Sequence, residues 1–252
     1  MRGGSSPLLT LADSPKNIPG MVYWYRGDAV HLTAGNVDTA IDKSGLGRNA
    51  VQAVGANQPV WGATSGPNGT PGWTSPDGVR LLVTPAINIG GLTMTNIVVL
   101  QPNMVAGTGA LLSTFTPVIT IGQFLNACSV LGSPVLQGEH NGTAGFSNWY
   151  SSPIVNNTPH IAEFQHNKNV VSEQIRVYTD GALTAQSTTG ADADVTDPFG
   201  NFAINIGQRG NGTLGFTGVI AEIIGYTTLL TAQQRQNLYR GYLGPRYGIV
   251  VP

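Results

Sequence analysis

Apolar and polar residues alternate with a period of two over several short stretches of the chain. The alternating stretches are 21–26 (MVYWYR), 160–166 (HIAEFQH), 173–181 (EQIRVYTDG) and 201–208 (NFAINIGQ), and shorter apolar runs lie at 96–102, 110–115 and 117–122. In EQIRVYTDG, the apolar Ile175 and Val177 point to one side of a strand and the polar residues between them to the other. Glycine, proline, asparagine or aspartate separates the stretches. The pattern predicts an all-β fold, a two-sheet antiparallel jelly-roll sandwich.

One segment, residues 231–243 (TAQQRQNLYRGYL), has the spacing of a helix instead. Thr231 can cap its start, and Gln234 stands three residues later, where the second member of a capping box belongs. The apolar residues fall on one stripe at i, i+3 and i+4 spacing: Leu238, Tyr239, Tyr242 and Leu243. Gly244-Pro245 is expected to end the segment. The sequence therefore predicts one short C-terminal helix.

The first 19 residues differ from the rest of the chain. Pro7, Pro15 and Pro19, together with the Gly-Gly-Ser-Ser stretch at 3–6, oppose helix and strand interiors, while Leu8, Leu9 and Leu11 offer apolar surface to a partner. We interpret residues 1–19 as an N-terminal arm and residues 20–252 as a single domain. No apolar stretch resembles a secretory signal or approaches the ~20 residues that cross a bilayer. We expect a protein made in the host cytoplasm, without membrane insertion.

Charge is sparse and balanced in this chain of 252 residues, with 12 basic and 13 acidic side chains and a net charge of −1. Nucleic-acid binding normally requires a basic stripe that neutralises phosphates, so we expect no nucleic-acid partner. Glycine (34) and proline (16) are spread along the chain, as in proteins built from many short strands joined by turns. Cys128 is the only cysteine, which excludes an intrachain disulfide.

A single acid, Glu222, interrupts the apolar run GVIAEIIGY at 218–226. A buried carboxylate must be paired or accept several hydrogen bonds, because otherwise it takes up a proton. We predict that Glu222 serves structure, with Arg26 on the first strand and Arg246 after the helix as its partners. Such a contact ties the start of the domain to its end.

Several segments together resemble one family. They are IDKSGLGRNAVQ (41–52), QPVW (58–61), VYTDG (177–181) and the closing GVIAEIIGY and LLTAQQRQNLYRGYLGPRYGI. In this order and spacing they resemble the laminin-G-like branch of the concanavalin-A-like lectin/glucanase superfamily. The resemblance implies a two-sheet antiparallel jelly roll. It also implies two settings in which such domains recur, extracellular adhesion modules and bacteriophage virion or tail proteins.

Glycoside hydrolases of the wider superfamily use two carboxylates that flank the scissile bond. The resemblance to laminarinase-like members implies that such acids would alternate along one strand, yet Glu222 shares its face with Ile220, Ile224 and Tyr226. Their Glu-x-Asp-x-x-Glu pattern does not occur in the chain. We therefore predict a protein that is not an enzyme, while distant glutamates that meet on folding remain an alternative.

The sequence contains a few acidic residues and histidines that could bind a metal ion, each with a simpler interpretation. Laminin-G-like domains sometimes bind calcium, but only Asp38 and Asp42 are near the Asp-Lys-Ser-Gly turn, too few for six to eight oxygen ligands. The loop ADADVTD offers three carboxylates, Asp192, Asp194 and Asp197, as candidate calcium ligands, with solvated loop charge as the alternative. Calcium is the one cofactor left open. His160 and His166 are too far apart along a strand for one metal, and we expect a rim or surface position for each of these two.

Trp73, Trp149 and Tyr150 lie in turn-rich, polar stretches where a ring can be exposed. An exposed aromatic ring serves either as a platform for a sugar or as part of a protein interface.

Three classes of function follow. The first is a non-enzymatic virion structural protein, a bacteriophage head or tail decoration or fibre subunit. It would form a homo-oligomer and bind other virion proteins through its arm. The second is a carbohydrate-binding, lectin-like module that recognises a host-surface glycan. The third is a polysaccharide-degrading glycoside hydrolase. The absence of a catalytic carboxylate pair and the family resemblance favour the first.

Overall fold

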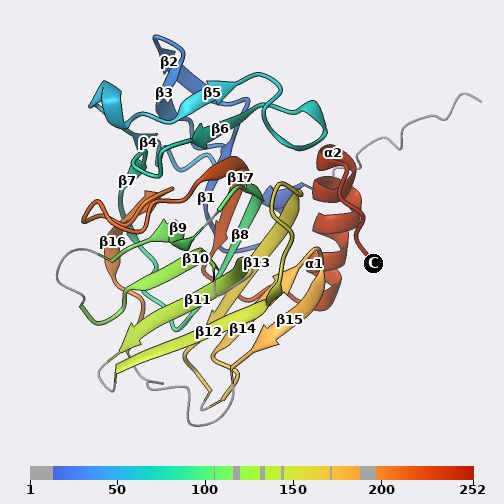
Figure 1. Cartoon of the computed structure of the whole chain (residues 1–252). Coiled ribbons are helices and arrows are strands. Elements are labelled where there is room, and N and C mark those ends of the chain that lie inside the picture. Colours follow the sequence, from blue (N-terminus) through green and yellow to red (C-terminus); the bar gives the residue numbers. More distant parts are fainter. Residues whose placement is uncertain are drawn as a thin grey trace, which may run out of the picture.

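The computed structural model describes residues 14–104, 106–115, 120–130, 134–142, 145–170, 172–187 and 197–252. Its strands form two stacked antiparallel layers (Figure 1). The first layer runs in the order β1 (Met21–Arg26), β17 (Gly218–Tyr226), β8 (Thr93–Pro102), β13 (His160–Asn167), β14 (Ile175–Thr179) and β15 (Ala182–Gln186). The second runs β7 (Leu82–Asn88), β16 (Asn201–Ile206), β9 (Gly107–Ser113), β10 (Phe124–Val130), β11 (Pro134–Gly142) and β12 (Gly145–Pro153).

Five short strands lie at one end of the sandwich, drawn in blue to teal in Figure 1. They are β2 (Val30–Thr33), β3 (Asn36–Ala40), β4 (Ala50–Val51), β5 (Val60–Gly62) and β6 (Gly72–Ser75). Strand β4 pairs with β7 of the second layer, and β6 pairs with β17 of the first. These strands therefore connect the two layers, and the predicted two-sheet antiparallel jelly roll is confirmed.

The main core fills the space between the layers. On β14, Ile175 and Val177 are fully buried, whereas Arg176 and Tyr178 between them are partly exposed, as the alternation in the sequence predicts. Strand β17 differs because both of its faces are buried. Ile220 and Ile223 belong to the core between the layers, and Ile224 belongs to a second apolar cluster beneath the C-terminal helix. This double burial explains why 218–226 is an apolar run rather than an alternating one.

The C-terminal helix covers the outer face of the first layer (Figure 1). It consists of α1 (Ala232–Leu238), a π-helical turn η5 (Tyr239–Leu243) and α2 (Gly244–Tyr247). The predicted capping box is present, since Thr231 Oγ1 accepts from the N–H of Gln234 and Gln234 Oε1 accepts from the N–H of Thr231. In the described part of the chain, no helix is long and apolar enough to cross a bilayer.

The expected end of the helix at Gly244-Pro245 is wrong. The helical conformation continues through α2 to Tyr247, and the helix ends at Gly248, which has a φ of 65°. Proline stands directly after the π-helical turn, where the hydrogen-bond pattern of the helix changes, and its fixed φ of about −65° suits a helix. Gly248 supplies the left-handed conformation that ends many helices.

Residues 14–19 pack against the domain. The 3-10 turn η2 (Pro15–Asn17) is followed by Ile18, which is buried in the cluster beneath the helix. The hydroxyl of Tyr226 donates to the carbonyl of Pro15 (3.0 Å), and Thr228 Oγ1 donates to the carbonyl of Pro19 (3.0 Å). The packed domain thus begins before the predicted boundary at residue 19. Only residues 1–13, which lie outside the described part, remain for the arm.

Candidate functional site

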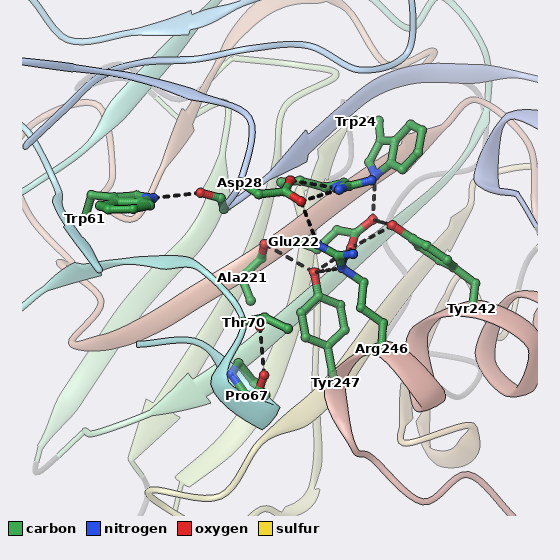
Figure 2. Close-up of polar contacts among 12 residues, drawn as sticks. Trp24, Asp28, Trp61, Pro67, Thr70, Ala221, Glu222, Tyr242, Arg246 and Tyr247 are labelled. Carbon is green, nitrogen blue, oxygen red and sulfur yellow. Dashed lines mark hydrogen bonds and ion pairs between the residues drawn. The ribbon is translucent and has the colours of Figure 1, made fainter. Parts of the chain in front are cut away.

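Glu222 lies on β17, between the first layer and the C-terminal helix, and is 1% exposed. Its Oε1 accepts from Trp24 Nε1 (2.5 Å) and the Tyr242 hydroxyl (2.9 Å), and its Oε2 accepts from the Tyr247 hydroxyl (2.6 Å; Figure 2). Burial raises the pKa of Glu222, and the hydrogen bonds from Tyr247, Trp24 and Tyr242 and the charge of Arg246 oppose that rise. Because these side chains enclose the carboxylate, it cannot reach a substrate.

The two arginines expected beside Glu222 take different positions. Arg246 Nε lies 3.7 Å from Glu222 Oε2, and Arg246 Nη2 lies 2.9 Å from Asp28 Oδ2, so Arg246 joins the two acids. Arg26 pairs with Asp28 instead (Nε to Oδ1, 2.9 Å), which corrects its predicted role. Arg26 lies opposite Glu222 in the β1–β17 ladder, but the carboxylate of Glu222 accepts its hydrogen bonds from Trp24, Tyr242 and Tyr247 instead. The guanidinium of Arg26 stays near the surface, 5.7 Å from the Trp24 ring centre.

Glu163 on β13 is a second enclosed acid, which the sequence analysis did not single out. Arg235 Nε (2.8 Å) and the Tyr239 hydroxyl (2.6 Å) donate to its Oε2, and Gln165 Nε2 (2.7 Å) donates to its Oε1. Arg235 and Tyr239 come from the C-terminal helix. Glu163 and Glu222 therefore both fasten this helix to the first layer. The sequence does contain a signal that could have identified Glu163, because this acid lies within the alternating stretch HIAEFQH.

Glu139 on β11 differs from these two acids. It is half-buried, and burial raises its pKa to about 7 despite the charge of Arg209 and a hydrogen bond from Gln137. Within the described residues its carboxylate accepts one hydrogen bond, from Gln137 Nε2 to Oε2 at 3.3 Å, and its Oε1 accepts none. Glu139 thus keeps acceptor capacity that Glu163 and Glu222 have used.

The strand register places Glu139 on the outer face of the second layer. Directly paired residues share a face of a sheet. One row of direct partners crosses five strands: Asn205, Ser113, Leu125, Glu139 and Asn148. Leu125 belongs to a small apolar cluster separate from the main core, whereas its neighbour Phe124 belongs to the core between the layers. The row therefore faces away from the core, on the side opposite the helix-covered layer.

Arg209 lies beside this row, on the loop between β16 and β17. Its guanidinium is 5.4 Å from the ring centre of Phe115, and its Nε is buried without a hydrogen-bond partner in the described part. A closed turn fixes its backbone, because its N–H donates to Thr213 O (3.0 Å) and its carbonyl accepts from Gly212 N (3.0 Å). Gln137 Nε2 also donates to Asn148 Oδ1 (3.1 Å). We call Phe115, Gln137, Glu139, Asn148 and Arg209 the outer-face site.

The three candidate aromatic residues lie in strands. Trp73 is 3% exposed and belongs to the main core, so its expected exposure is wrong. The reason is that β6 pairs with β17, opposite Ile220, which turns the indole inward. Trp149 and Tyr150 lie on β12, opposite Gly138 and Gln137, immediately after Asn148. Their side chains lie outside the described part of the structure, so their role as ligand or interface residues stays a prediction.

The candidate metal ligands are not brought together in the described part. Asp192 and Asp194 lie outside it, and among the residues described, Asp197 included, no group of three or more histidine, cysteine or acidic side chains could hold an ion. Asp42 is occupied by hydrogen bonds: its Oδ1 accepts from the N–H of Trp24 and of Ser44, and its Oδ2 from Ser44 Oγ and the N–H of Arg48. Asp42 therefore holds the turn from Asp42 to Arg48 together through its side chain.

Two histidines form a buried pair. His140 on β11 and His166 on β13 are both 0% exposed, with their Nδ1 atoms 3.2 Å apart. The expected rim or surface position is wrong for His166, and also for the buried His160. The distance between His160 and His166 along β13 did not predict this pair, because the histidine nearest to His166 is His140, on a strand of the opposite layer.

Comparison with known proteins gives the fold. No protein-family model matches the chain, and no curated protein matches it in sequence. The binding domain of Paraclostridial Mosquitocidal Protein 1 is similar in structure, with a TM-score of 0.62, 12% identity, and coverage of 91% of this chain and 53% of that one. Domain 4 of AbnA, an extracellular GH43 arabinanase from Geobacillus stearothermophilus, has a TM-score of 0.59 and 13% identity, covering 87% and 98%.

A sialidase from Trypanosoma rangeli also has a TM-score of 0.59, with 14% identity, covering 88% of this chain and 33% of the sialidase. The chain thus spans about half of the mosquitocidal domain and a third of the sialidase. At such low identity the likeness shows the fold alone, a β-sandwich. The narrower resemblance to the laminin-G-like branch stays a prediction.

Proposed function

We propose that this chain is a carbohydrate-binding, lectin-like module whose ligand occupies the outer-face site. The observation that carries the proposal is Glu139, a half-buried acid with a free acceptor oxygen, in line with the amides of Gln137 and Asn148 and beside Arg209. Saccharide hydroxyls both donate and accept, so their sites combine carboxylate acceptors with amides, which do both. The outer face of the other layer is covered by the C-terminal helix, whereas on this face Glu139 and Asn148 are partly exposed.

The similar structures support this proposal through their ligands. Domain 4 of the arabinanase was solved in complex with arabinotriose, and the Trypanosoma sialidase in complex with sialic acid. The binding domain of Botulinum Neurotoxin DC, with a TM-score of 0.55 and 8% identity, was solved in complex with SialylT. Because one fold carries many functions, the outer-face site bears the argument and these likenesses are secondary.

Binding is favoured over hydrolysis by the positions of the acids. A glycosidase places two carboxyl groups on either side of the scissile bond. Within the described residues, Glu163 and Glu222 are enclosed, and the groups that shift the pKa of Glu139 are burial, Arg209 and Gln137, with no acid among them. The outer-face site therefore supplies one carboxylate, which suits recognition of a sugar.

A glycan array followed by calorimetric titration tests the proposal. We expect the purified protein to bind at least one saccharide, and Glu139→Ala and Asn148→Ala each to weaken binding about ten- to a hundredfold, the effect of losing a strong hydrogen bond. Trp149→Ala tests the adjoining aromatic prediction. Glu173→Gln, in a surface ion pair with Arg176, is the matched control and should bind normally. A folded protein that binds no saccharide would contradict the proposal.

A second candidate is an attachment subunit on a virion, docked through residues 1–13. The favouring observation is that Pro15 and Ile18 are anchored on the helix-covered layer, so the chain enters the domain on the side opposite the outer-face site. A subunit fixed by its arm would then present the site outward. Deleting residues 1–12 should leave the melting temperature unchanged and abolish incorporation into particles. Normal incorporation of the shortened protein would exclude this docking.

A further inference from the structure

We infer that the ligand of the outer-face site is an acidic saccharide whose carboxylate is bound by Arg209. This inference rests on the proposed carbohydrate binding and names the class of sugar. Uronic and sialic acids share the required chemistry, a carboxylate attached to a ring that carries hydroxyl groups.

Arg209 differs from the other arginines in how its guanidinium is used. The described part contains eight arginines: 26, 48, 80, 176, 209, 235, 240 and 246. Seven donate a side-chain hydrogen bond to a carboxylate or a carbonyl within the protein. Arg209 donates none in the described part, and its Nε is buried. The Nε of Arg176 is also buried and unpaired, but Nη2 of Arg176 donates to Glu173. A buried donor without a partner is rare in folded proteins and calls for an explanation, and a bound ligand supplies one.

The surroundings of Arg209 suit a planar anion. A guanidinium offers donors in a fork that matches both oxygens of a carboxylate. The ring of Phe115 lies 5.4 Å from the guanidinium carbon, and the turn from Arg209 to Thr213 holds the backbone through two hydrogen bonds. The side chain is therefore held near the sheet surface before any ligand arrives, which lowers the cost of binding.

Glu139 complements Arg209 without neutralising it. Arg209 lowers the pKa of Glu139 through its charge, whereas the side-chain hydrogen bond to this carboxylate in the described part comes from Gln137. Among the described residues, Arg209 is the charged group that faces Glu139, and its other polar neighbours, Gln137 and Asn148, are neutral. With a pKa of about 7, Glu139 is protonated below neutrality and can donate to a ligand carboxylate oxygen. Above neutrality it is ionised and repels that oxygen.

This arrangement predicts binding of an acid that weakens as the pH rises. A ligand that needs protonated Glu139 loses affinity toward a limit of tenfold per pH unit above its pKa. A neutral saccharide bound through the ionised carboxylate would show the opposite trend. The pH profile thus separates acidic from neutral ligands without knowledge of the exact glycan.

The experiment is a calorimetric titration with 3′-sialyllactose, tri-galacturonate and neutral lactose at pH 6, 7 and 8. We expect one acidic probe to bind at least tenfold more tightly than lactose at pH 6, and which acidic probe binds distinguishes sialic from uronic acid. Arg209→Met, which keeps the contact with Phe115, should remove that preference. Glu139→Gln, which keeps a donor at all pH values, should flatten the pH profile. Arg240→Met, on the exposed end of the helix, is the control.

Two outcomes would overturn the inference in different ways. Binding of lactose with equal or higher affinity, unchanged in Arg209→Met, rejects the acidic ligand and leaves carbohydrate binding in place. No binding of any saccharide on the wider array rejects both proposals together.

Discussion

The glutamates of this protein differ in how many donors reach the carboxylate, and that number determines what each acid can do. Glu222 accepts from an indole and two tyrosine hydroxyls, and Glu163 from an arginine, a tyrosine and a glutamine. Both are saturated and enclosed, as a buried charge must be. Glu139 is reached by one long hydrogen bond. Saturated acids hold the fold, and the unsaturated acid is available to a ligand.

Replacing Glu222 by alanine tests this division at the level of one residue. The change leaves the N–H of Trp24 and the hydroxyls of Tyr242 and Tyr247 buried without an acceptor, beside Arg246. We expect a loss of about 3–5 kcal/mol in the free energy of unfolding, the usual effect of breaking a buried pair on one side. Urea denaturation measures it, and Glu173→Gln on the surface should stay within about 1 kcal/mol of wild type. An unchanged urea midpoint for Glu222→Ala would reject the structural role.

The sequence made Glu222 visible and left Glu139 hidden, for a physical reason. An acid within an apolar run has only one plausible environment, so its neighbours along the chain give its burial. Glu139 stands among glycine, histidine and asparagine, the composition of an exposed strand or turn. Its half-burial depends on partners from other strands, such as Leu125 in the register of β10, and this burial raises its pKa. The charge that opposes the rise comes from Arg209, which lies 70 residues away along the chain.

At the scale of elements, the periodicity of the sequence predicted the start and the buried face of the C-terminal helix, which depend on residues close together in the chain. The stripe of Leu238, Tyr239, Tyr242 and Leu243 is buried against the first layer, and the capping box forms as the sequence indicates. The π-helical turn and the continuation through Pro245 were not predictable from spacing. They allow Tyr247 to reach Glu222, a contact across 25 residues that appears only in the folded chain.

Strands with mixed composition were the elements that local patterns missed. Residues 145–153 (GFSNWYSSP) have the glycine, serine and proline content of a turn, yet they form β12 along the edge of the second layer. Strand propensity is weak, and pairing with a neighbour overrides it. The pairing of β12 with β11 places Asn148 beside Glu139. The candidate site is therefore a product of register, which a single sequence does not contain.

At the scale of the whole molecule, a chain of side-chain hydrogen bonds crosses repeatedly between the two layers. Asn126 Nδ2 donates to His166 Nε2 (2.8 Å), so the proton of His166 lies on Nδ1 and points to Nδ1 of His140. His140 then carries its own proton on Nε2 and donates it to Gln174 Oε1 (3.0 Å). The full order is Tyr23, Asn96, Asn126, His166, His140 and Gln174. Each side chain in this series donates a hydrogen bond to the next one. This arrangement requires the imidazoles of His140 and His166 to be neutral.

This requirement predicts how stability depends on pH. Burial, with the nearby His140 and Lys168, holds the pKa of His166 well below its usual value of about 6.5. Below about pH 6.5, His166 therefore binds a proton in the unfolded chain but not in the native state. The free energy of unfolding then falls as the pH falls, by up to about 1.4 kcal/mol per pH unit. Urea unfolding at pH 8, 7, 6 and 5 measures the slope. His166→Leu should be less stable than wild type at pH 8 but lose less between pH 7 and 5.

The control for this prediction is His31→Asn, since the side chain of His31 is 70% exposed and the change should leave the slope nearly as in wild type. Glu222 acts in the opposite direction, because its raised pKa lowers stability as the pH rises above about 4.5. That contribution is the same in wild type and in His166→Leu, so the difference between their two slopes isolates the histidine. Equal slopes would mean that His166 is protonated in the folded protein, and the one-directional chain between the layers would then have to be abandoned.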